Sequence, residues 1–148
     1  MMDPVTFDIC WSRLVGVVNE QAAALQRTSF TSIVREAGDL SAGVFDRRGW
    51  MLAQAVTGTP GHINSMALCV RHMLAAIPLE AIRPGDVLIT NDPWKGSGHL
   101  NDVTIATPVF RGDDCVALFA STCHTADIGG HILSAEAREV YELSLIHI

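Results

Sequence analysis

The sequence predicts an α+β fold in which amphipathic helices pack on antiparallel hairpins. Apolar residues recur at spacings of three and four in two long segments, which is typical of helices with one buried face. Short apolar runs separated by turn residues indicate antiparallel hairpins. Because these helices and hairpins follow one another in irregular order, the chain does not match the regular βαβ winding of a parallel sheet.

The first predicted helix begins at Pro4 and ends near Arg27. Asp3 can cap this helix, and proline suits its first position because that amide needs no partner. Its apolar stripe consists of Phe7, Trp11, Leu14, Val18, Ala22 and Leu25. We therefore expect an amphipathic helix with this stripe facing a core.

The rest of the chain alternates between hairpins and one further helix. Residues 41–54 predict a hairpin, because two apolar runs flank a turn at 46–49. A second helix starts at Pro60, and its apolar stripe continues to Ile77. The later elements are expected to be a strand at 87–90 and a longer hairpin formed by 103–110 and 115–123.

The composition limits the kinds of function. The chain has 148 residues, 49% of them apolar and 18% charged, which is enough for one domain or for a piece of something larger. A net charge of −6 without any Lys or Arg run argues against nucleic-acid binding. No apolar stretch reaches the roughly 18 residues of a membrane span, and the N-terminus lacks signal-peptide features. Four cysteines in apolar runs predict buried free thiols in a reducing cytoplasm.

The most informative residues are His99, Asp102 and His124, which lie in two polar, Gly-rich stretches beside apolar runs. Two imidazoles and a carboxylate are the ligand set of many catalytic divalent-metal sites. If Phe110 pairs with Cys115 across the turn of the longer hairpin, Asp102 lies opposite Cys123 and His124 lies opposite Asn101. A bulge of one residue would then put Asp102 directly opposite His124 and on the same face.

Ordinary structural roles compete with metal binding at each of these positions. Loop histidines, aspartates that accept local amides and histidines at strand ends are common without a metal. His62, at the start of the second helix, is ambiguous in the same way, whereas His72 falls opposite the apolar stripe and is expected in solvent. Glu36 and Asp39 flank Gly38 before a strand, where turn residues and functional residues are equally expected. Spacing alone leaves the metal site open.

Several stretches resemble one known family, in order from residue 3 to about residue 140. They are DPVTF (3–7), ALQRT (24–28), DLS and VFD (39–46), LAQ (52–54), PGDV (84–87), NDP (91–93), GHLNDV (98–103) and HTADIGG (124–130). Together they resemble the hydantoinase B/5-oxoprolinase family. That family includes the B-type component of ATP-dependent N-methylhydantoinase, the C-terminal part of 5-oxoprolinase, and the alpha subunits of acetone and acetophenone carboxylases.

The resemblance covers only part of the family's length. It implies that residues 3–142 are the N-terminal part of a larger hydantoinase B/oxoprolinase domain. Residues 143–148 do not continue the pattern, and we expect them to be a truncated or non-native end. Thr125 also departs from the pattern, because many relatives carry a second histidine or an aromatic residue there.

The resemblance also implies a metal centre. In the carboxylase branch the corresponding subunit holds a divalent metal, which is manganese in acetone carboxylase. By this resemblance His99, Asp102 and His124 bind such an ion here, with manganese expected first and zinc or iron as alternatives. An acidic ligand from an earlier loop would correspond to Glu36, and Asp127 would hold an imidazole in place.

The function implied by the resemblance is that of one subunit in a larger enzyme. A hydantoinase A-type partner would handle ATP, which agrees with the lack of a GxxxxGK[ST] or GxGxxG motif here. The expected activity is ATP-dependent opening of a cyclic amide, 5-oxoproline or a hydantoin. The alternatives are an alpha-type subunit of an ATP-dependent ketone carboxylase and a non-catalytic, metal-free assembly module. Alone, this chain is expected to be inactive and to self-associate.

Overall fold

The computed structural model describes residues 2–125 of the chain. The predicted domain boundary at 142, the predicted chain end at 143–148 and Asp127 therefore lie outside the described residues. No helix within residues 2–125 is long and apolar enough to cross a membrane.

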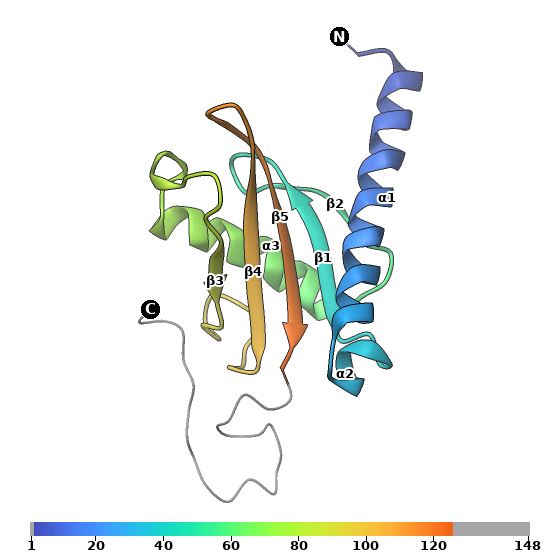
Figure 1. Cartoon of the computed structure of the whole chain (residues 1–148), viewed down its shortest axis with the longest axis vertical. Coiled ribbons are helices and arrows are strands. Elements are labelled where there is room, and N and C mark those ends of the chain that lie inside the picture. The colour runs from blue at the N-terminus through green and yellow to red at the C-terminus, as the bar shows by residue number, and fades with distance from the viewer. Residues whose placement is uncertain (1, 126–148) are drawn as a thin grey trace, which may run out of the picture.

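A five-stranded antiparallel sheet, in the order β2-β1-β5-β4-β3, forms the centre of the described part (Figure 1). Its strands are β1 (Leu40–Phe45), β2 (Met51–Gln54), β3 (Leu88–Thr90), β4 (Asp102–Arg111) and β5 (Asp114–His124). β1 and β2 form one predicted hairpin, and β4 and β5 form the other. Pairing of β1 with β5 joins the hairpins into one sheet, and the α+β class is confirmed.

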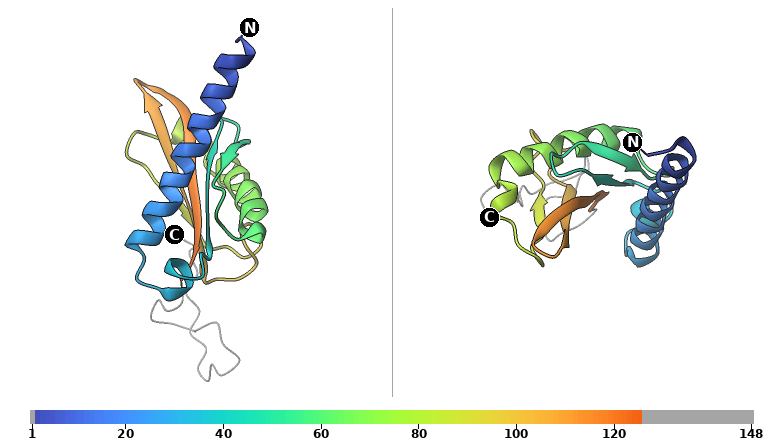
Figure 2. Two further views of the ribbon diagram at one scale, coloured as in Figure 1. Left: turned by 90° about the vertical axis from the view of Figure 1, so that its right-hand side faces the viewer. Right: turned by 90° about the horizontal axis from the view of Figure 1, so that it is seen from above.

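Helices pack on both faces of this sheet. They are α1 (Pro4–Thr28), α2 (Ser32–Arg35), α3 (Pro60–Ala76) and the 3-10 turn η1 (Leu79–Ala81). α1 and α3 lie on opposite faces, and each closes its own hydrophobic core (Figure 2). The core under α3 includes Phe45, Met66, Val70 and Leu118. The core under α1 includes Val18, Ala22, Leu40 and Val44.

Only the second half of α1 packs on the sheet. A helix of 25 residues is about 37 Å long, whereas a strand of 6 residues spans about 20 Å, so α1 extends beyond β1 (Figure 1). Phe7 and Trp11 of the predicted stripe are 54% and 45% exposed. Cys10, on the same part of the helix, is exposed as well. The predicted burial of these residues is therefore wrong, because the sheet ends before the helix does.

The β4–β5 hairpin contains the bulge on which the predicted site depends. Phe110 pairs with Cys115, and the register shifts between Val109 and Phe110. As a result Asp102 pairs with His124 and not with Cys123, which precedes His124 in the chain. The hypothesis that a one-residue bulge aligns these two side chains on one face is confirmed.

Candidate metal centre

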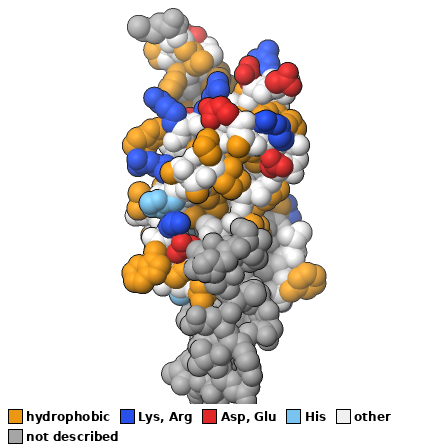
Figure 3. Space-filling model, turned by 90° about the vertical axis from the view of Figure 1, so that its left-hand side faces the viewer, with side chains coloured by type: hydrophobic (Ala, Val, Ile, Leu, Met, Phe, Trp, Pro, Cys, Tyr) orange, Lys and Arg blue, Asp and Glu red, His pale blue; other side chains and the backbone are white. Residues whose placement is uncertain are grey.

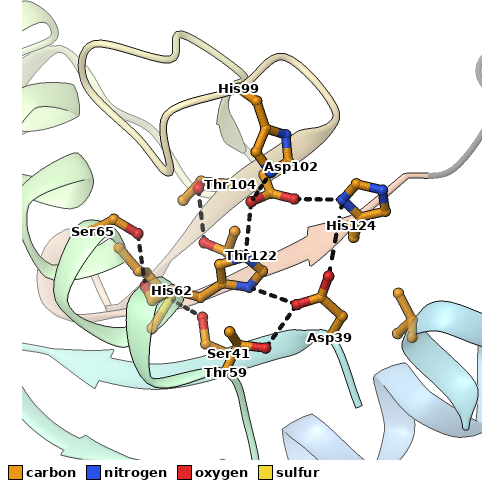
Figure 4. Close-up of polar contacts among 12 residues, drawn as sticks. Asp39, Ser41, Thr59, His62, Ser65, His99, Asp102, Thr104, Thr122 and His124 are labelled. Carbon is orange, nitrogen blue, oxygen red and sulfur yellow. Dashed lines mark hydrogen bonds and ion pairs between the residues drawn. The ribbon is translucent and has the colours of Figure 1, made fainter. Parts of the chain in front are cut away.

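Polar side chains from distant parts of the chain converge where β4 begins and β5 ends (Figure 4). Asp102 is the first residue of β4, and His124 is the last residue of β5. His99 lies in the loop before β4, Asp39 directly precedes β1, and His62 lies in the first turn of α3. This end of the sheet therefore brings imidazoles and carboxylates from four separate segments together.

The three residues predicted as ligands lie within reach of one ion. His99, Asp102 and His124 each offer a ligand atom, and these atoms all lie within 4.8 Å of one another. His124 Nδ1 is 2.9 Å from Asp102 Oδ1, and His99 Nε2 is 3.1 Å from Asp102 Oδ2. Asp102 and His124 are buried, whereas 33% of the His99 side chain is exposed. Solvent therefore reaches the group from the side of His99.

Asp39 and His62 also lie in this group, although the sequence around them fits an ordinary structural role as well as a functional one. His62 Nε2 is 2.8 Å from Asp102 Oδ2, and His62 Nδ1 is 3.7 Å from Asp39 Oδ1. Asp39 Oδ2 lies 4.0 Å from His124 Nδ1, and the His124 amide donates to the Asp39 carbonyl at 3.2 Å. The signal that locates Asp39 is the β1–β5 register, which the sequence does not reveal. No local signal locates His62.

Glu36 is not brought to this group as the resemblance implied. It lies at the C-terminal end of α2, where its side chain is 70% exposed and pairs with Arg35 at 3.4 Å. Asp39, three residues later, supplies the carboxylate from this part of the chain instead. The reason is that a hydrogen bond to β5 holds the backbone of Asp39 beside the cluster. The amide of Glu36 instead bonds to the carbonyl of Ser32 within α2.

The charges of the cluster stabilise one another. Burial opposes ionisation of Asp102, but close contacts with His62, Ser97 and His124 outweigh burial and lower its pKa to about 2. Contact with Asp102 raises the pKa of His62, and burial acts in the opposite direction. An ionised carboxylate among imidazoles is therefore the stable arrangement at neutral pH.

Several buried polar atoms of the cluster lack a hydrogen bond. They are Asp102 Oδ2, His99 Nδ1 and His62 Nδ1. Two imidazoles approach Asp102 Oδ2 closely, and each contact becomes an ion pair when its imidazole is protonated. Imidazole nitrogens and carboxylate oxygens are accepted ligands of Mn²⁺, Zn²⁺ and Fe²⁺. The donor set therefore fits a divalent ion.

Polar residues at its start hold the loop that carries His99. The buried Asn91 side chain donates to the carbonyl of Leu100 at 3.0 Å. The buried carboxylate of Asp92 accepts from the amide of Trp94 at 2.9 Å. The Asn91 contact connects the start of the loop with its end, one residue after His99, whereas the Asp92 contact holds the turn at the start of the loop.

A separate hollow of about 150 Å³ lies between α3 and β3. Its lining includes Cys69, His72, Met73 and Asp92 but none of the five residues of the cluster. Hydrophobic and charged side chains are mixed on the side of the molecule nearest β3 (Figure 3). His72 is exposed, as predicted. Burial raises the pKa of the Cys69 thiol to about 11, which makes it a poor nucleophile.

A sequence model of the hydantoinase B/oxoprolinase family matches residues 3–146 of this chain. 5-oxoprolinase PfmaA of Pestalotiopsis fici is 34% identical over 144 residues, which are 95% of this chain and 11% of that protein. A putative D-/L-hydantoinase component of the B type from Pseudomonas sp. (strain NS671) is 31% identical over 131 residues, which are 86% of this chain and 22% of that protein.

The fold has a counterpart among solved structures. ATP-dependent caprolactamase from Pseudomonas jessenii aligns with a TM-score of 0.72 and 25% sequence identity. The alignment covers 98% of this chain and 26% of that one. The chain thus spans only a small part of the length of each of these three proteins.

Proposed function

The chain belongs to the hydantoinase B/oxoprolinase family, and we propose that it is part of an ATP-dependent enzyme that opens 5-oxoproline or a hydantoin. The observation that carries the proposal is the convergence of His99, Asp102 and His124 in a chain of this family. The three similar proteins are an oxoprolinase, a hydantoinase subunit and a caprolactamase, and all three names refer to cyclic amides. A cyclic amide is therefore the substrate class that these similarities support.

The proposed role of the cluster is to bind one divalent metal ion through His99, Asp102 and His124. Asp39 replaces Glu36 as the further carboxylate, because Asp39 Oδ2 is 4.0 Å from His124 Nδ1. When bound, such an ion would polarise an amide carbonyl or activate water. The buried residues would hold it from the protein side and leave the side of His99 open to substrate. The family resemblance makes manganese the first candidate, and zinc and iron are alternatives that suit imidazole ligands.

ATP belongs, in this proposal, to a hydantoinase A-type partner, because the 148 residues contain neither nucleotide motif. Transfer of the terminal phosphoryl group of ATP to the amide oxygen on that partner would release ADP and prepare the carbonyl carbon for attack by water. That attack would break the ring C–N bond and release phosphate. This chain would orient the carbonyl and the water, which lowers the barrier through proximity. Asp127 is proposed to hold an imidazole in place. The four cysteines are free, as suits an enzyme of the reducing cytoplasm, where we place the complex.

The test is to purify the complete protein with its A-type partner, to measure its metal content, and to assay ATP hydrolysis. We expect bound divalent metal and ATP hydrolysis that requires 5-oxoproline or a hydantoin. Hydrolysis that instead requires acetone and bicarbonate would contradict the proposal and assign a ketone carboxylase. A complex without metal would also contradict it, and would assign a non-catalytic assembly role.

A further inference from the structure

We propose that the first turn of α3 positions both carboxylates of the metal centre, through Thr59 for Asp39 and through His62 for Asp102. Both are positioning residues, because they act through the two carboxylates. The inference rests on the proposed metal site, and it assigns a purpose to groups outside the predicted ligand set. Thr59 and His62 are one helical turn apart, so a single rigid element holds both.

Thr59 occupies the N-cap position of α3, but its side chain makes no capping hydrogen bond. Threonine is favoured at this position because its oxygen normally accepts from an amide of the first turn. Thr31, at the N-cap of α2, does so, and accepts from the amide of Val34 at 3.3 Å. The Thr59 hydroxyl instead donates to Asp39 Oδ1 at 2.7 Å, a hydrogen bond strengthened by the negative charge of the carboxylate.

His62 lies between the two carboxylates (Figure 4). Its Nε2 is 2.8 Å from Asp102 Oδ2, and its Nδ1 is 3.7 Å from Asp39 Oδ1. The side chain is 10% exposed, and Nδ1 has no hydrogen-bond partner although it is buried. A histidine placed only for packing would not need carboxylates on both sides of its ring. The ring therefore separates Asp39 from Asp102 and limits how each can rotate.

The chain before α3 is held against the residues that begin β1. The amide of Thr59 donates to the carbonyl of Leu40 at 3.0 Å, next to Asp39 in sequence. Gly58 makes this approach possible, because a Cβ at that position would lie 2.7 Å from the Leu40 carbonyl oxygen. The backbone thus fixes Thr59 beside Asp39 before any ion binds. Such a preformed arrangement lowers the cost of ordering ligands around a metal.

The first test compares Thr59→Val, which removes the hydroxyl, with Thr59→Ser, which keeps it. Affinity is measured in the complete protein by titration with Mn²⁺, following the electron paramagnetic resonance of the free ion. Thr59→Val should weaken Mn²⁺ binding by about 10–100-fold, and Thr59→Ser should restore most of it. The spectrum of bound Mn²⁺ should change in the valine variant and return in the serine variant.

Thr31→Val is the matched control, because Thr31 is a functioning cap. Thr31→Val should lower the midpoint of thermal unfolding more than Thr59→Val does, while Mn²⁺ affinity stays at the wild-type value. The two substitutions are therefore expected to separate stability from metal binding. If both variants lose stability and neither loses affinity, Thr59 has a structural role alone and the inference is wrong.

The second test uses His62→Leu, which removes both ring nitrogens, and His62→Gln, which keeps a donor near Asp102. We expect His62→Leu to weaken Mn²⁺ binding and alter its spectrum, with partial recovery in His62→Gln. If Thr59→Val and His62→Leu both bind Mn²⁺ like wild type while His99→Ala loses it, the metal site stands and the positioning role is refuted. If wild type takes up no ion, both proposals fail.

Discussion

The two long helices begin with the same local pattern, a polar residue followed by proline, yet their first turns make different contacts. Asp3 opens α1, and its carboxylate accepts from the amide of Thr6 at 3.0 Å. Thr59 opens α3, and its hydroxyl donates away from the helix to Asp39 at 2.7 Å. The first contact is a local cap, and the second connects the helix to a carboxylate of the candidate metal centre.

The surroundings of the two first turns differ as well. The start of α1 extends beyond the sheet and exposes Phe7 and Trp11, whose rings stack at 6.1 Å (Figure 1). The first turn of α3 is packed against the sheet and buries His62. The contrast teaches that a polar residue and a proline mark where a helix begins. The packing around that turn decides whether it also has a chemical role.

The largest expected effect is loss of metal binding when a ligand is removed from the cluster beside the first turn of α3. His99→Ala and Asp102→Ala should each abolish Mn²⁺ binding, because each removes one donor from a small ligand set. His99 is partly exposed, so its loss should leave the unfolding midpoint close to wild type. His72→Ala, on the exposed side of α3, is the matched control and should keep the ion. Stoichiometric metal in both ligand variants would contradict the site.

The next largest effect, on both stability and metal binding, is expected from a substitution at Gly58, where the chain enters α3. Gly58 has φ +147°, and a Cβ there would lie 2.7 Å from the Leu40 carbonyl oxygen. Gly58→Ala should lower the free energy of unfolding by about 1–3 kcal/mol, because backbone conformation and contact are both strained. It should also weaken Mn²⁺ binding, because the first turn of α3 must move away from Asp39.

Gly61→Ala is the control for that substitution, because a Cβ at Gly61 meets no atom within 4 Å. Its free energy of unfolding should stay unchanged or rise by up to about 1 kcal/mol, since alanine favours helix. Denaturant unfolding and Mn²⁺ titration of both variants measure the difference. Equal results for Gly58→Ala and Gly61→Ala would show that the close approach at Gly58 does not hold the site.

A smaller effect is expected at the exposed start of α1. The isolated chain should self-associate through this apolar surface, and the double variant Phe7→Glu, Trp11→Glu should remain monomeric in sedimentation velocity. Mn²⁺ affinity should not change, because neither residue is near the cluster. Phe30→Glu is the control: Phe30 is 99% exposed but lies outside α1, so association should persist. A wild-type chain that is already monomeric would contradict this prediction.

The smallest effect is expected from Asp3→Ala. Loss of the cap should destabilise only the first turns of α1, because they do not pack on the sheet. Hydrogen exchange of the first amides of α1 should become about 2–5-fold faster, with global unfolding nearly unaffected. Mn²⁺ binding should stay at the wild-type value. If Asp3→Ala weakened it as strongly as Thr59→Val, the contrast between the two helix starts would be wrong.

Local signals in the sequence account for much of the fold. Turn residues and apolar spacing locate both long helices and both hairpins, because these features depend on neighbours only a few positions apart. The alternation of side chains along paired strands, with one bulge, also aligns Asp102 with His124. The wrong prediction of burial at the start of α1 also comes from local signals. An apolar stripe shows which face of a helix can be buried but not what packs against it.

The sequence by itself determined most of the elements and the family, and it predicted that His99, Asp102 and His124 lie together, as they do. The tertiary structure alone decided that Asp39, and not Glu36, stands beside them, because this depends on how β1 pairs with a strand about eighty positions away. It also decided that His62 enters the cluster and that Thr59 bonds a carboxylate instead of capping its helix. Spacing and capping patterns describe the contacts available within one segment. Which of those contacts form depends on the long-range pairing that brings the segments together.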